Sequence, residues 1–172
     1  LIIQPCRSKL FGSVDLPEKT LTVFLPEMLK EISVETVSAD VELMGGAAGT
    51  LSVSTTSGNI LGPGLQVKEL ELGTVSGDIR LSQYPAGCST VDCETVSGEV
   101  SLGFTSCPEE IDLNSVSGDL ALSLPEGSRY DLEFDTVSGS RYTSDQGSGG
   151  TALCKITAET VSGDLTVRAD GK

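Results

Sequence analysis

The sequence contains no histidine and no tryptophan, and each absence narrows what the chain can do. Without histidine it lacks the usual general base of serine and cysteine hydrolases and one of the two common zinc ligands. Five cysteines are present, but none forms a CxxC pair, so a thiol metal site is not expected. Four Phe and three Tyr leave few large side chains to fill a thick globular core.

Positive charge and long apolar runs are also scarce. The chain has 11 Lys and Arg against 25 Asp and Glu, for a net charge of −14. The electrostatic field of this negative charge repels phosphate backbones, so nucleic acid is not an expected partner. No stretch approaches the roughly 18 apolar residues that a membrane-spanning helix needs. We expect membrane contact only through a segment beyond this sequence.

The sequence does contain a repeat of the form φxφxTVSGDφxφ, where φ is apolar. Seven copies can be aligned on the serine of the motif, and successive copies are 19 to 24 residues apart. Small variation in spacing is typical of coils joined by loops of adjustable length. The anchor serines are Ser38, Ser57, Ser76, Ser97, Ser117, Ser138 and Ser162.

Apolar and polar residues alternate within each copy, which predicts strands with one buried face. The Ser-Gly-Asp step and the prolines mark two turns in each copy. Two strands and two turns could form one hairpin of a meander or one coil of a solenoid. Only the solenoid places identical residues beside each other, so we expect an all-β single-stranded β-helix, or β-solenoid, of about seven coils. Residues 1–30 would form a strand-like N-terminal cap and imperfect first coil, and residues 31–172 the seven repeats of a single domain.

The direction of the motif valine is left open by the sequence. Strict alternation turns the threonine and the anchor serine inward and the valine outward, whereas a bend at the glycine would turn the valine inward. An outward valine ladder would be a candidate interaction face, since a contiguous apolar strip usually marks a contact site. The residues are Val37, Val75, Val96, Val116, Val137 and Val161, with Thr56 in the remaining copy.

Cys88 and Cys107 precede their anchor serines by 9 and 10 residues, so we expect them in the same turn of adjacent coils. Stacked turn positions fall within disulfide reach, and the pair would be either bridged or two separate thiols. Cys93 occupies an apolar position and is expected to be a buried thiol. The candidates for exposed aromatic residues are Tyr84, Tyr130 and Tyr142.

No catalytic, cofactor-binding or metal-ligating residue is predicted. The serines repeat sevenfold without an adjacent base, which indicates turns rather than nucleophiles. Asp78, Glu99 and Asp119 would stack about 4.8 Å apart. Such a column could hold a cation or a carboxylate pair, but a row of water-facing turn caps is the simpler interpretation.

The repeated SGD steps resemble the DUF4097 family of bacterial adhesin-like β-strand repeat proteins, over about Leu21 to Val167. This sequence departs from the pattern at Ala39, Asn59, Glu99 and Ser140. The resemblance implies a β-helical rod displayed outside the bacterial membrane, with no catalytic residues to carry over. Our hypothesis is a non-catalytic extracytoplasmic binding or adhesion module for a surface protein or glycan. The alternatives are a structural spacer, a rod that self-associates end to end or face to face, and a carbohydrate-active β-helix enzyme.

Overall fold

The computed structural model describes residues 22–23, 28–84, 87–144 and 154–170. Within these ranges the chain forms a parallel β-solenoid of about six turns and contains no helix. Every strand pair is parallel, which excludes the meander and confirms the predicted fold class. No helix of the described residues is long and apolar enough to cross a membrane.

Twelve strands make up the described solenoid. They are β1 (Leu29–Glu35), β2 (Val41–Thr55), β3 (Ile60–Thr74), β4 (Ile79–Tyr84), β5 (Thr90–Ser97), β6 (Val100–Phe104), β7 (Glu110–Ser117), β8 (Leu120–Pro125), β9 (Tyr130–Ser138), β10 (Arg141–Thr143), β11 (Cys154–Ser162) and β12 (Leu165–Asp170).

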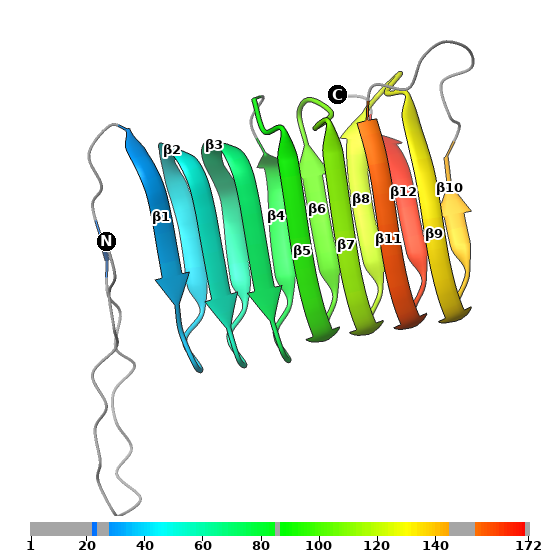
Figure 1. Ribbon diagram of the computed structural model, residues 1–172, viewed down its shortest axis with the longest axis horizontal. Helices are drawn as coiled ribbons and strands as arrows, with labels where there is room; N and C mark the ends of the chain where they lie inside the picture. Colours follow the sequence, from blue (N-terminus) through cyan, green and yellow to red (C-terminus); the bar gives the residue numbers. More distant parts are fainter. Residues whose placement is uncertain (1–21, 24–27, 85–86, 145–153, 171–172) are drawn as a thin grey trace, which may run out of the picture.

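The strands form two facing layers, which we call the front and back sheets (Figure 1). The strand before each TVSGD step lies in the front sheet, which contains β1, β5, β7, β11, β9 and the later parts of β2 and β3. The strand after each step lies in the back sheet, which contains β4, β6, β8, β12, β10 and the earlier parts of β2 and β3. β2 and β3 are long because each passes through both sheets.

The core is a thin stack of aliphatic side chains between the two sheets. Equivalent positions of neighbouring copies are in register, so that Leu70 pairs with Val91 and Val91 with Ile111. All three side chains are almost completely buried. The largest buried ring is that of Tyr84, which packs edge-on against Phe104 with ring centroids 6.0 Å apart. Like-on-like stacking explains how a chain with few aromatic residues fills its interior.

The coils are not stacked in chain order. β11 of the seventh copy pairs with β7 on one side and with β9 on the other. β12 likewise lies between β8 and β10 (Figure 1). The seventh copy is therefore inserted between the fifth and the sixth, and Ser162 aligns with both Ser117 and Ser138.

The sixth copy forms one end of the stack as a result. It is the copy that departs furthest from the motif, with Ser140 and Arg141 after the glycine. Its second strand, β10, has only three residues, and Leu132 and Phe134 of β9 are only half-buried. At the other described end, β1 is bonded to β2. Most of the expected cap at residues 1–30 lies outside the described residues.

Candidate functional site

The TVSGD step forms the corner between the two sheets. In the second and third copies its threonine is buried, and the hydroxyl accepts a hydrogen bond from the backbone N–H of the glycine three residues later. This distance is 3.0 Å both for Thr55 with Gly58 and for Thr74 with Gly77. A Cβ placed on Gly77 would overlap the carbonyl oxygen of Gly58 in the neighbouring coil. Glycine is therefore required because two backbones approach closely, whatever its φ angle.

The anchor serines lie on the outside of this corner, contrary to the expectation that they face inward. Their hydroxyls bond along the stack, since Ser57 donates to the carbonyl of Val37 at 3.1 Å and Ser76 to that of Thr56 at 3.3 Å. The alternation fails here because the chain begins to turn at the valine, so valine and serine both face solvent. The hydroxyls of Ser57, Ser76 and Ser97 thus hold neighbouring turns together.

The acidic residues of the motif form a hydrogen-bonded ladder along the same corner. Asp40 accepts the backbone N–H of Asn59 at 2.7 Å, and Asn59 accepts that of Asp78 at 2.9 Å. Asp78 accepts that of Glu99 at 3.0 Å. After the fifth copy, Asp119 takes the N–H of residue 164 in the same way. A carboxylate or carboxamide oxygen at this position thus bonds the backbone of the next coil, as a turn cap does.

The hydrogen-bonded ladder changes the pKa of Asp78. Its pKa lies below the ordinary value, chiefly because its carboxylate accepts the backbone N–H of Glu99. The guanidinium of Arg80 adds a second, smaller effect, with Nη1 2.7 Å from the Asp78 carboxylate. Arg80 also reaches Glu99 at 2.8 Å. The bond to the next coil therefore favours the charged form of Asp78.

The motif valines form an exposed ridge beside this corner, which we call the valine ridge. Val75, Val96, Val116 and Val161 are 46–50% exposed, and Val137 at the end of the stack is 84% exposed. Val37 near the other end is 67% exposed. Of the two directions that the sequence left open, the structure shows the outward one for all six predicted valines.

A shallow groove of about 680 Å³ runs along the stack next to the valine ridge. One side is formed by Val75, Val96, Val116, Val137 and Val161, and the buried threonine column lies beneath it. The front sheet contributes Glu94, Asp135 and Glu159. The groove therefore offers an apolar wall across five coils and carboxylates from three of them.

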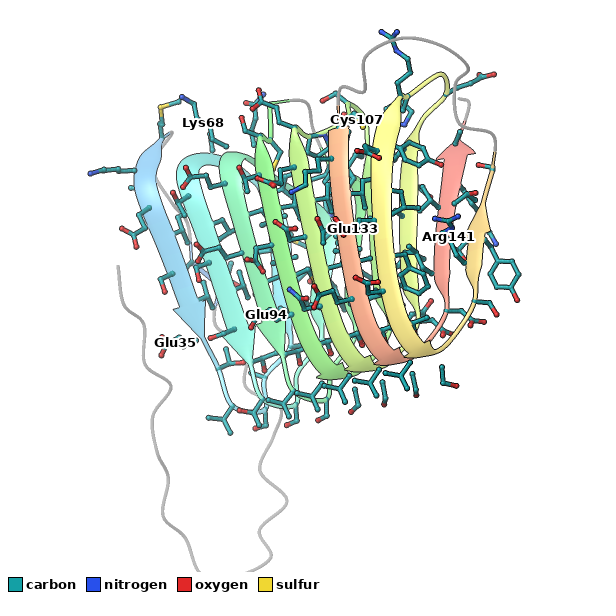
Figure 2. The ribbon with its side chains drawn as sticks, turned by 45° about the vertical axis from the view of Figure 1, so that its right-hand side comes forward. Glu35, Lys68, Glu94, Cys107, Glu133 and Arg141 are labelled. Carbon is teal, nitrogen blue, oxygen red and sulfur yellow. The ribbon has the colours of Figure 1, made fainter. Side chains whose placement is uncertain are left out.

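The outer surface of the front sheet is strongly acidic. Glu94 of β5 and Glu133 of β9 project from this side of the solenoid (Figure 2). The pKa of Asp92 lies above its ordinary value, first because of burial and then because of repulsion from Glu94, Asp112 and the carboxylate of residue 71. After burial, repulsion between the carboxylates of this face therefore contributes to the raised pKa of Asp92.

The outer surface of the back sheet has a different character. Ser101, Ala121 and Thr166 occupy equivalent positions of β6, β8 and β12 and are half-buried. Tyr142 of β10 is 56% exposed, whereas Tyr84 and Tyr130 are buried. Of the three expected aromatic contacts, only Tyr142 is on the surface, and it lies outside the groove.

Cys88 and Cys107 are both free thiols in the structure. Cys88 is buried against the carbonyls of Lys68 and Thr90, and burial raises its pKa to about 11. The thiol of Cys107 lies near that of Cys154, and each shifts the pKa of the other. The inserted seventh coil places Cys154 on the side of Cys107 that faces away from the fourth coil. Cys93 is a buried thiol, as expected.

Among the described residues, no three His, Cys, Asp or Glu side chains are grouped so as to hold a metal ion. The four buried hydroxyls of Thr95, Ser115, Thr136 and Thr160 have no hydrogen-bond partner there. They lie in the threonine column under the groove, where side chains of neighbouring coils pack on them. The surface feature with the most distinct chemistry is therefore the groove with its valine ridge.

The sequence pattern identified the valines but not the groove. Glu94, Asp135 and Glu159 all stand two residues before the motif valine, so three of the copies contain a signal for carboxylates beside the ridge. The Cys107 and Cys154 contact had no such signal, because it depends on the inserted coil.

The comparison with protein families gives one match, and no curated protein and no solved structure matches the chain. The model of the Toastrack family, DUF4097, matches residues 12–168, which include every complete copy of the repeat. The match agrees with the solenoid of TVSGD corners described above. The chain therefore belongs to the Toastrack DUF4097 family.

Proposed function

We propose that this domain is a non-catalytic binding module that acts outside the cell and holds a basic protein segment in the groove beside the valine ridge. The observation that carries the proposal is the exposure of the motif valines, five of which are neighbours in one ridge from the third copy to the end of the stack. Thr56 separates the sixth, Val37, from them. Solvating such a strip is costly, and a contiguous apolar surface on a soluble protein usually marks an interaction site.

The chemistry of the groove favours a protein segment over a glycan. Glycan sites commonly stack sugar rings on aromatic side chains, and none of the described residues that line this groove is aromatic. Glu94, Asp135 and Glu159 would instead pair with Lys or Arg of a partner whose apolar side chains contact the valines. The net charge of −14 would attract such a partner from a distance.

The location outside the cell rests on the resemblance to bacterial adhesins. Two properties of the domain suit a protein that works in a dilute environment without chaperones. One is a stacked core that needs no bound ligand, and the other is a high negative charge. Adhesion would then be binding to a surface protein through the groove.

The test compares fluorescent peptides of equal length in which valine alternates with lysine, with serine or with glutamate. We expect tightest binding of the valine and lysine peptide, with weaker binding at high salt. Changing Val75, Val96 and Val116 together to Thr should weaken binding at least tenfold and keep the β-sheet spectrum. Preference for the glutamate peptide, binding only to a glycan array, or unfolding of the triple variant would contradict the proposal.

The matched control changes three outward positions of the back sheet, Ser101→Thr, Ala121→Thr and Ser123→Thr. These changes also introduce three threonines on an outer strand surface, but on the back sheet and outside the groove. Peptide affinity should therefore be unaltered. Equal loss in the control would show that the valine changes act through the fold and not through contact.

A structural rod remains the second candidate, because β9 at the end of the stack pairs with only one strand among those described, β11. An open parallel edge can accept a strand of another copy. Light scattering at increasing concentration tests this candidate. A constant monomer mass would exclude the rod and favour the binding module, whereas a mass that rises with concentration would favour the rod.

A further inference from the structure

The inserted seventh coil brings two cysteines from distant parts of the chain into contact. Cys154 is the first residue of β11, and the next residue, Lys155, is in register with Glu110. The backbone N–H of Lys155 donates to the carbonyl of Glu109 at 2.8 Å, which fixes the start of β11 against the turn that precedes β7. Cys107 belongs to that turn, two residues before Glu109, so its thiol lies close enough to that of Cys154 for each to shift the pKa of the other.

The two thiols differ in access and in acidity. Cys107 is half-buried at an edge of the solenoid (Figure 2), while Cys154 is 1% exposed. The neighbouring Cys154 thiol lowers the pKa of Cys107 against the opposing effect of burial, and Ser128 lowers it further. The same contact and burial raise the pKa of Cys154. Cys107 is thus the more accessible and the more acidic of the two thiols, with Cys154 behind it.

This contact depends on the order of the coils. β9 and β11 are in register, with Cys154 beside Tyr130. If the sixth copy followed the fifth, Tyr130 would occupy the position next to the fifth coil, and Cys154 would lie one rung further on. Two rungs separate equivalent residues by roughly 10 Å, which exceeds the Cα separation of about 4.4 to 6.8 Å that a disulfide allows.

We propose that Cys107 and Cys154 are a thiol modification site that closes into a disulfide and covalently staples the inserted seventh coil to the fifth. A small-molecule disulfide such as oxidised glutathione serves as the oxidant. The Cys107 thiolate attacks one of its sulfurs and releases one glutathione thiolate. Cys154 then loses its proton to solvent and its sulfur displaces the second glutathione from Cys107. Two protein thiols lose two electrons and two protons, and one glutathione disulfide becomes two thiols.

The disulfide would lie where the order of the coils in the stack differs from the order of the copies in the chain. The sixth and the seventh copies carry the same apolar register, so their positions in the stack are exchangeable in principle. A bond between Cys107 and Cys154 ties the seventh copy to the fifth in every state of the chain, including the unfolded one. It therefore restricts the unfolded ensemble and excludes the alternative order.

The experiment uses the whole chain, reduced and then equilibrated with mixtures of reduced and oxidised glutathione. Free thiols are blocked with a maleimide, and the chain is digested and mapped by mass spectrometry. We expect the loss of two thiols with a linked peptide pair containing Cys107 and Cys154. The thermal midpoint should rise by roughly 10 °C on oxidation.

Three variants separate this site from the other thiols. Cys107→Ser should abolish both the linked pair and the rise in midpoint, and Cys88→Ser, the matched control, should leave both intact. Cys154→Ala repeats the test from the buried side, with the sheet spectrum as the check on folding. A bridge between Cys88 and Cys107, oxidation that stops at mixed disulfides with glutathione, or no thiol loss at excess oxidant would each overturn the proposal.

Discussion

The carboxylate of Asp119 accepts a hydrogen bond from the backbone N–H of Asp164 at 2.9 Å, although the two residues are 45 positions apart in the chain. Asp164 in turn accepts the N–H of Ser140 at 2.8 Å. The ladder that joins consecutive copies earlier in the chain therefore also joins the fifth copy to the seventh and the seventh to the sixth. Ser140 ends it with a side chain too short to continue the pattern.

Asp119→Ala should destabilise the fold by about 1 to 2 kcal/mol, because the N–H of Asp164 loses a charged acceptor. Chemical denaturation followed by circular dichroism measures the change. Glu126→Ala, in the exposed turn after β8, is the control and should stay within about 0.5 kcal/mol. Equal effects of the two changes would show that the ladder adds nothing at this coil.

Gly118→Ala should prevent normal folding or cost more than about 3 kcal/mol, because the added Cβ would overlap the carbonyl oxygen of Gly98. Gly73→Ala is the matched change, since its Cβ would meet only the Ser54 Cβ at 3.8 Å, an ordinary contact. We expect the second variant to keep or slightly raise the stability of the parent. A soluble Gly118→Ala protein with parental unfolding would disprove the close approach of the corners.

Thr74 and Thr95 occupy equivalent positions and should respond oppositely to replacement by valine. Thr74→Val removes the acceptor of the Gly77 N–H and should cost about 1 kcal/mol. Thr95→Val removes a buried hydroxyl with no partner among the described residues, so it should stabilise by a similar amount. Equilibrium unfolding of both variants decides the matter, and a loss of stability in each would contradict the assignment for Thr95.

Asp92→Asn should stabilise the domain at neutral pH. The folded pKa of Asp92 is raised by burial and by the neighbouring carboxylates, so its contribution to stability is greatest at low pH and is lost as the pH rises through that raised value. The variant avoids this loss. Its advantage in thermal midpoint should shrink as the pH falls toward the ordinary value of 3.8, and an advantage independent of pH would point to a different cause.

Asp78→Asn should show the reverse pH dependence. The folded pKa of Asp78 is lowered, so its contribution is fully present above 3.8 and is lost as the pH falls through the lowered value. The variant keeps an oxygen that can accept the Glu99 N–H, as Asn59 does for Asp78, but loses the charge that favours this bond and the pair with Arg80. We expect a small loss of midpoint at neutral pH that disappears in acid.

The local pattern of the sequence was enough to predict the strands, the corners and the stacking of like on like. Period-two alternation decides which side chains are buried, and glycine and aspartate at the corner are required by close backbones and by N–H groups that need acceptors. These are interactions within one copy or between any two neighbouring copies, so the repeat itself specifies them.

Tertiary structure alone decided the order of the coils and everything that depends on it. Ile111, Leu132 and Ile156 occupy equivalent positions, so the seventh copy pairs in the same register with the fifth and the sixth. The sequence of a single copy therefore does not specify which copy lies next to it. The copy with Ser140 and the short β10 lies at the end, where no further N–H has to be accepted. The contact of Cys107 with Cys154 and the acidic groove beside the valine ridge then follow from distances between copies, which the sequence of one copy does not contain.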